Sequence, residues 1–173
     1  MILPKLVITD IDGVWTDGGM YYDALGNELK KFNTLDSAGV LFLRENNIPL
    51  AIMTGEQTPI VELRSKKLKV EHVFLGAKDK LSLALELCQK LEVKISEVAF
   101  MGDDLNDIAL LKAAGFSGCP ANAPVYVKEL VDFVGQKSGG SGAFREFVEH
   151  ILTGNLLLEQ TISNCVEKMA KPT

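Results

Sequence analysis

The feature that most constrains the fold is a series of short apolar runs that alternate with segments of helical character. Runs of this length, rich in β-branched residues, are typical of strands buried on both faces. They occupy residues 6–9, 49–55, 73–75 and 98–102, with shorter candidates at 116–118 and 133–134. Helical patterns or helix-start signals follow them at 36–45, from 58 onward, and at 79–91, 106–113, 143–152 and 156–171. The alternation predicts an α/β fold: a doubly wound parallel sheet of Rossmann-like type with helices on both faces.

One segment departs from this alternation. Residues 20–22 and 29–32 are short strand candidates, and the turn-forming residues 23–27 separate them. We therefore expect a β-hairpin within residues 14–33 that protrudes from the main sheet. The chain has 173 residues and lacks a long linker, a low-complexity segment or an internal repeat, so we expect one domain over residues 1–173. The C-terminal tail, about 155–173, has no function that the sequence indicates.

Composition narrows the possible partners and the compartment. The net charge is −5, so nothing favours nucleic-acid binding. No apolar run reaches the roughly 18 residues of a membrane span, and residues 1–5 do not resemble a signal peptide. Cys88, Cys119 and Cys165 are widely spaced and odd in number, which indicates reduced thiols in a cytoplasmic protein.

Polar side chains collect where the predicted strands end. Asp10 and Asp12 follow the first strand, and Thr54 and Gly55 follow the second; Gly102, Asp103 and Asp104 end the strand at 98–102, with Asp107 one helical turn further. Ligands of such sheets bind beyond the carboxyl ends of the strands. A single aspartate there is usually a helix cap, but several converging carboxylates repel one another and require a cation. Oxygen ligands favour Mg²⁺. An EF-hand does not fit, because a strand rather than a helix precedes Asp10.

Lys80 begins a helix after the strand at 73–75, so it can point to the same edge of the sheet. Alone it would be interpreted as a surface charge. The ordered set Asp-x-Asp, Thr, Lys and Gly-Asp-Asp on successive strand–helix junctions, however, resembles the haloacid dehalogenase superfamily of phosphotransferases. The matching residues are Asp10-Ile11-Asp12-Gly13, Thr54, Lys80 and Gly102-Asp103-Asp104-Leu105-Asn106-Asp107, and the resemblance covers essentially the whole chain.

The resemblance implies a role for each of these positions. Asp10 would be the nucleophile that forms an aspartyl-phosphate, and Asp12 the general acid and then base. An acid at Asp12 favours a phosphatase over an ATPase. Mg²⁺ would be held by Asp10, the backbone carbonyl of Asp12, and Asp103. Thr54, Gly55 and Lys80 would bind the phosphoryl group. Supporting positions complete the motif: Asp107 would orient Lys80 or a metal-bound water, Asp104 would cap the next helix, and Asn106 lies between them.

Most members of this superfamily carry a cap domain, but the gaps in which one is inserted are short here. The segments 14–19, 26–28, 33–39 and 139–146 are similar to those of a capless family, the 3-deoxy-D-manno-octulosonate 8-phosphate phosphatases and their nine-carbon relatives. That resemblance implies a homotetramer whose hairpins pair across subunits, so that a neighbour covers each site. Trp15 and residues 20–22 suit such an interface, although Trp15 suits the core equally well.

The substrate within this family is a sugar acid phosphate, and one position separates its branches. Glu56 follows the Thr-Gly pair where the eight-carbon enzymes usually have arginine or glycine. Together with Arg64 and Lys67, it is similar to phosphatases of 2-keto-3-deoxy-nonulosonate 9-phosphate and N-acylneuraminate 9-phosphate. Arg64 and Lys67 share a helix face and could meet a substrate carboxylate. Arg145, behind the flexible glycines at 139–142, is a further candidate for substrate binding.

Other readings stay open at this point. The alternative substrates are 3-deoxy-D-manno-octulosonate 8-phosphate and another small phosphate ester. A two-component receiver domain also combines this type of sheet with an aspartate and Mg²⁺, but its acceptor follows the third strand, where this chain has no suitable lone aspartate. An inactive scaffold is disfavoured because all four motifs are intact.

Overall fold

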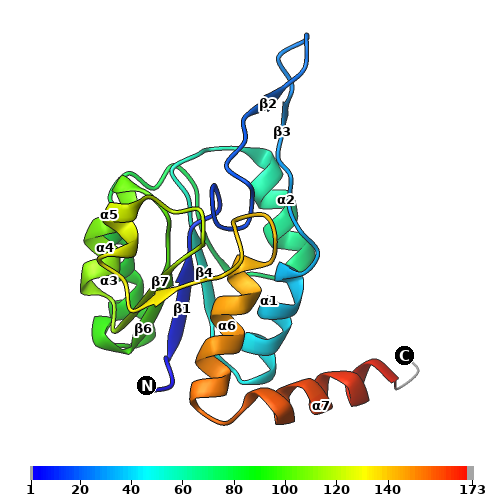
Figure 1. The fold of residues 1–173 in the computed structure, drawn as a ribbon, viewed down its shortest axis with the longest axis vertical. Helices are drawn as coiled ribbons and strands as arrows, with labels where there is room; N and C mark the ends of the chain where they lie inside the picture. The colour runs from blue at the N-terminus through cyan, green and yellow to red at the C-terminus, as the bar shows by residue number, and fades with distance from the viewer. Residues whose placement is uncertain (1, 171–173) are drawn as a thin grey trace.

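The computed structural model describes residues 2–170, which form a central parallel sheet with helices on both faces (Figure 1). The six strands are ordered β5-β4-β1-β6-β7-β8. Their bounds are Leu6–Thr9 for β1, Leu50–Met53 for β4, His72–Phe74 for β5, Val98–Met101 for β6, Phe116–Cys119 for β7 and Phe133–Val134 for β8. Every pairing is parallel, and Ile8 in the centre is matched to Ala51 on one side and Phe100 on the other. The α/β fold expected from the sequence is confirmed.

The helices divide between the two faces. They span Asp36–Glu45 (α1), Pro59–Leu68 (α2), Lys80–Leu91 (α3), Ile108–Ala113 (α4), Val125–Lys128 (α5), Ala143–Gly154 (α6) and Leu158–Ala170 (α7), with 3₁₀ turns at Ile95–Glu97 and Leu105–Asp107. Residues of α1, α2 and α6 pack with one set of strand residues, and residues of α3, α4 and α5 pack with the alternate set. The central strands β1, β4 and β6 are buried throughout, as their apolar sequences predict. None of the helices within residues 2–170 could cross a membrane.

The observed elements differ from the expected ones mostly by one or two residues at an end. The helix expected at 106–113 starts with the 3₁₀ turn Leu105–Asp107, because Asp104 caps that turn. The four-residue helix α5 was not predicted, since a single turn carries no periodic signal. The last helix begins at Leu158, and residue 171 of the expected range lies outside the described residues.

The predicted hairpin is present but shorter than expected. Its strands, β2 (Tyr21–Tyr22) and β3 (Glu28–Leu29), pair antiparallel. An isolated antiparallel bridge between Thr16 and Phe32 lies at the base of the hairpin. It projects from the end of the sheet opposite the N-terminus (Figure 1). Between β1 and β4 the chain holds only this hairpin and α1, and between β4 and α3 only α2 and β5. The carboxyl ends of the central strands are therefore not covered by an inserted segment.

Candidate active site

A polar pocket of about 250 Å³ lies beyond the carboxyl ends of β1, β4 and β6. The strand order switches between β1 and β6: β4 and β5 lie on one side of β1, and β6, β7 and β8 lie on the other. Open α/β sheets bind ligands at such a switch point. Most of the residues predicted for the site line this pocket: Asp10, Asp12, Thr54, Gly55, Glu56, Asp103, Asp104 and Asn106. The other two lining residues are Gly13 and Gly18. Three strand ends that are far apart in the sequence thus form one site.

A buried lysine neutralises part of the negative charge of the aspartates at this site. Lys80 is the first residue of α3, and the cap residue Asp79 accepts a hydrogen bond from the Ser82 amide. The Nζ atom of Lys80 lies 2.9 Å from Asp10 Oδ1 and 2.6 Å from Asp107 Oδ1, with the lysine side chain fully buried. The expected contact between Asp107 and Lys80 is therefore present. A lysine at this depth is stable only with such partners.

The carboxylates at the site outnumber the single buried lysine. Oxygens of Asp10, Asp103 and Asp107 lie within 4.8 Å of one another, and Asp103 Oδ1 is buried without a hydrogen-bond partner. Burial raises the pKa of Asp10 to about 7; Lys80 lowers it and Asp107 adds to the rise. Burial and the charges of Asp10, Asp107 and Asp104 raise the pKa of Asp103 to about 8. Like charges held this close match the ligand set of a hard divalent cation.

Two glycines explain how the carboxylates come so close. A Cβ atom on Gly13, whose φ is +87°, would overlap the carboxylate of Asp103, and one on Gly102 would overlap the side chain of Asp107. Backbone without side chains at these two positions lets the loops after β1 and β6 approach each other. The glycines in Asp-x-Asp-Gly and Gly-Asp-Asp are thus required by the packing of the charged groups.

Asp12 is held by a residue that the sequence analysis did not single out. Its Oδ1 accepts a hydrogen bond from Lys30 Nζ at 2.7 Å and one from Thr16 Oγ1 at 3.3 Å, while its Oδ2 is buried and has no partner. Lys30 belongs to the hairpin, just after β3. Only the dipeptide Lys30-Lys31 was visible in the sequence, and nothing there distinguished the buried lysine from the exposed one.

The remaining motif residues have mainly local contacts. Asp104 accepts hydrogen bonds from the Leu105 amide at 2.7 Å and from the Tyr126 hydroxyl at 3.0 Å, so it caps the turn as expected. Asp107 Oδ2 accepts the amides of Asp103 and Asp104 at 2.9 and 3.2 Å and fixes the loop after β6.

The proposed specificity residues fall into two groups. Glu56 lines the pocket, whereas Arg64, Lys67 and Arg145 do not line it in the same chain. Arg64 donates hydrogen bonds to the Ser37 hydroxyl at 2.8 Å and to the Asn33 carbonyl at 3.3 Å. Arg145 pairs with Glu149 at 2.7 Å, and Lys67 lines a separate hollow beside α1.

The glycines before α6 are packed rather than free. A Cβ atom on Gly139 would overlap the Gly13 carbonyl, and one on Gly140 would approach the Asp17 amide to 2.6 Å. The Gly140 amide donates to the Val14 carbonyl, and its own carbonyl accepts from Asn33. The glycines therefore give close backbone packing against the loop after β1, where the sequence had suggested a flexible segment.

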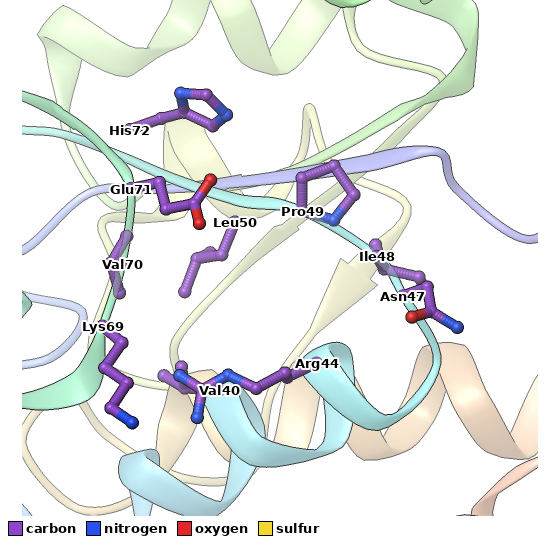
Figure 2. A pocket seen from close by; sticks show the side chains of 10 residues that line it. All are labelled: Val40, Arg44, Asn47, Ile48, Pro49, Leu50, Lys69, Val70, Glu71 and His72. Atoms are coloured by element: carbon purple, nitrogen blue, oxygen red, sulfur yellow. The ribbon is translucent and has the colours of Figure 1, made fainter.

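A second hollow, of about 390 Å³, lies at the opposite end of the strands (Figure 2). It is formed by the ends of α1 and α2 and the starts of β4 and β5. Its lining residues are Val40, Arg44, Asn47, Ile48, Pro49, Leu50, Lys69, Val70, Glu71 and His72. Its single carboxylate, Glu71, makes no cluster comparable to that around Asp10, so its larger volume does not make it the catalytic site.

Comparison with known proteins agrees with this geometry. Residues 63–146 match the family model of haloacid dehalogenase-like hydrolases. A 3-deoxy-D-manno-octulosonate 8-phosphate phosphatase from Haemophilus influenzae is 40% identical over 148 residues, which cover 86% of this chain and 82% of that protein.

Solved structures give the same result. A probable phosphatase of the yrbi family from Pseudomonas syringae has a TM-score of 0.91 at 40% identity, covering 95% of this chain and 93% of that one. The 3-deoxy-D-manno-octulosonate 8-phosphate phosphatase from Moraxella catarrhalis, solved with magnesium, phosphate and the sugar acid, has a TM-score of 0.90 at 35% identity, covering 93% and 92%. The chain therefore belongs to the haloacid dehalogenase-like hydrolases and, within them, to the 3-deoxy-D-manno-octulosonate 8-phosphate phosphatase family of phosphoric monoester hydrolases.

Proposed function

We propose that this protein is a Mg²⁺-dependent phosphatase of a 2-keto-3-deoxy sugar acid phosphate, acting through an aspartyl-phosphate on Asp10. The observation that carries the proposal is the cluster of Asp10, Asp103 and Asp107 around Lys80 at the carboxyl ends of the central strands. It combines a nucleophilic oxygen, a cation for the phosphoryl group and a ligand set for a metal.

Each residue has its own role in the reaction. Asp10 attacks phosphorus, and the bond to the sugar oxygen breaks as Asp12 gives that oxygen a proton. Water then attacks the aspartyl-phosphate and passes its proton to Asp12, which releases phosphate and restores Asp10. Lys80 and Thr54 bind the phosphoryl oxygens, since both lie at the same edge of the sheet.

The metal site fits Mg²⁺. Asp10, Asp103 and the backbone carbonyl of Asp12 would hold the ion, whose charge would offset that of the phosphate and of the attacking carboxylate. The unpartnered Asp103 Oδ1 supports this assignment, because such a buried oxygen is costly without a ligand.

The test is activity with and without magnesium. We expect Mg²⁺-dependent release of phosphate, and loss of turnover in Asp10→Asn. Wild-type hydrolysis by Asp10→Asn would reject the proposed nucleophile.

The relatives favour the eight-carbon substrate, since the Haemophilus and Moraxella proteins carry that name. A nine-carbon sugar acid 9-phosphate is the second candidate, favoured by Glu56, which lines the pocket and can accept hydrogen bonds from sugar hydroxyls. The ratio of kcat/KM on the two phosphates separates them. Glu56→Ala should lower the nine-carbon value selectively if that substrate is the natural one.

A homotetramer would complete the site. The hairpin exposes Met20, Tyr21, Tyr22, Leu25 and Leu29, a set that a monomer rarely leaves in water. Arg64, Lys67 and Arg145 do not line the pocket of their own chain, so they would contact a substrate either where it extends beyond that pocket or in the site of a neighbouring subunit.

Sedimentation velocity measures the assembly. A tetramer that Tyr22→Lys dissociates supports this arrangement, and a monomeric wild-type protein argues against it.

The three cysteines are buried and unbridged, which supports a cytoplasmic location.

A further inference from the structure

Lys30 is unusual among the lysines of the hairpin. Its side chain is only 1% exposed, whereas that of the adjacent Lys31 is 64% exposed. Successive residues of an extended chain point to opposite sides, so the hairpin turns one lysine inward and the other to solvent. Burying an ammonium group at this depth is costly unless charged partners receive it.

The partners of Lys30 connect it to the proposed acid–base residue. Its Nζ lies 2.7 Å from Asp12 Oδ1 and 3.2 Å from Glu28 Oε1. Thr16 Oγ1 donates to the same oxygen of Asp12, and Asp12 Oδ2 has no hydrogen-bond partner. Asp12 lines the catalytic pocket, but Lys30, Glu28 and Thr16 do not. Lys30 therefore contacts Asp12 without itself lining the pocket.

We propose that Lys30 is a positioning residue that fixes one oxygen of Asp12 and so sets the orientation in which the carboxyl group serves the leaving group of the substrate. Two donors on Oδ1, one from the hairpin and one from the loop after β1, set the rotation of the carboxyl group. Lys30 keeps its own protons throughout: the proton given to the sugar oxygen comes from Asp12, and the proton from water returns to it. The inference rests on the acid–base role proposed for Asp12.

This role makes a specific prediction about leaving groups. An alkoxide leaves slowly unless it is protonated, so hydrolysis of a sugar phosphate depends on a correctly placed acid. p-Nitrophenolate leaves without a proton, so formation of the aspartyl-phosphate from the aryl ester does not need Asp12 in the same orientation. Hydrolysis of the aspartyl-phosphate uses Asp12 as the base with either ester, so only the first step separates the two substrates. A variant that only misplaces Asp12 should therefore slow the release of the leaving group from the alkyl ester in a single turnover, and spare its release from the aryl ester.

The experiment compares Lys30→Met, which keeps the length of the side chain and removes its charge, on 3-deoxy-D-manno-octulosonate 8-phosphate and p-nitrophenyl phosphate with saturating Mg²⁺. We expect the single-turnover rate of sugar release, measured with enzyme in excess, to fall on the order of 10- to 100-fold, which is less than or equal to the smallest effect of complete general acid–base catalysis, roughly 10²- to 10⁴-fold. The single-turnover rate of p-nitrophenol release should fall less than about threefold, and KM should change less than about threefold on both esters. Lys30→Arg, which restores the cation, should recover part of the lost rate of sugar release.

Three further variants separate the possible causes. Lys31→Met removes a charge from the same strand of the hairpin without touching Asp12, and should leave both activities within about twofold of wild type. Lys30→Gln, a polar replacement of similar length, provides the same comparison if Lys30→Met does not fold. Asp12→Asn, measured on both esters, gives the reference for complete loss of the acid.

The outcomes are distinct. Equal losses in the single-turnover release of the two leaving groups in the Lys30 variants, with a selective loss in Asp12→Asn, would overturn the positioning role of Lys30 alone. A raised KM for the sugar phosphate with an unchanged rate of sugar release would also overturn it, because Lys30 would then bind substrate. Equal losses in the single-turnover release of both leaving groups in Asp12→Asn would reject the role of Asp12 as the acid, and the inference about Lys30 with it.

Discussion

Replacing Asp103 with asparagine should stabilise the metal-free protein while removing its response to magnesium. Asp103 carries one of the carboxylates that crowd around Lys80, and Asn has nearly the same shape without the charge. Burial and the neighbouring charges raise the pKa of Asp103 from 3.8 to about 8. The folded protein therefore binds a proton at pH 7 that the unfolded chain does not.

The magnitude follows from that difference. A pH of 7 lies about three units above the pKa of this carboxyl group in the unfolded chain. At about 1.36 kcal/mol per unit, keeping the group protonated in the folded protein destabilises it by about 4 kcal/mol. Asp103 is only partly buried, and solvent screening reduces the destabilisation to about 1–3 kcal/mol. For a chain of 173 residues, 1 kcal/mol moves Tm by about 2–4 °C, so Asp103→Asn should raise Tm by roughly 2–12 °C without metal.

The direction of this pKa shift also determines how the stability of the protein depends on pH. Because the folded pKa is raised, the favourable contribution is present below the unfolded pKa and is lost as the pH rises toward 8. The stabilising effect of Asp103→Asn should therefore grow between about pH 4 and pH 8. Magnesium should favour the wild-type protein over the variant. At 100 times its Kd, magnesium stabilises the wild-type protein by about 2.7 kcal/mol, and it should stabilise the variant by much less.

The assay is thermal unfolding of both proteins in chelator and in a magnesium series, at several pH values. Lys112→Met on α4 serves as a matched control for a surface charge change near β6. A lower Tm of metal-free Asp103→Asn, or equal stabilisation of both proteins by magnesium, would refute the electrostatic reasoning.

Three further changes test other parts of the structure. Gly139→Ala should lower the free energy of unfolding by about 1–3 kcal/mol in urea denaturation, and should also lower turnover, because its Cβ would displace the Gly13 carbonyl. Wild-type values of both would contradict the packing described for this loop. Arg64→Met should cost about 1–2 kcal/mol through the lost hydrogen bond to Ser37, and an unchanged free energy of unfolding would show that this contact is dispensable. Burial raises the pKa of Asp36 to about 6, so its contribution to stability declines as the pH rises from about 4 to 6; Asp36→Asn should flatten that part of the stability curve, and an unchanged slope would refute the assignment.

The sequence by itself determined the sheet and the composition of the site. The apolar runs at β1, β4 and β6 specify buried parallel strands, because no other element accommodates so short a run without polar residues. Once these strands are parallel, their carboxyl ends share an edge. Asp10, Thr54 and Asp103 must then converge, whatever the details of the loops between them.

Only the tertiary structure decided which charged side chains work together. Lys30 and Lys31 are the same residue type side by side in the sequence, and only the placement of the hairpin beside the loop after β1 directs Lys30 onto Asp12. Likewise Arg64 shares a helix face with Lys67 in the sequence pattern, but Ser37 and the backbone of Asn33, about 30 residues earlier in the chain, take its hydrogen bonds. Such partners come from segments whose approach depends on packing of the whole domain, and local periodicity carries no information about them.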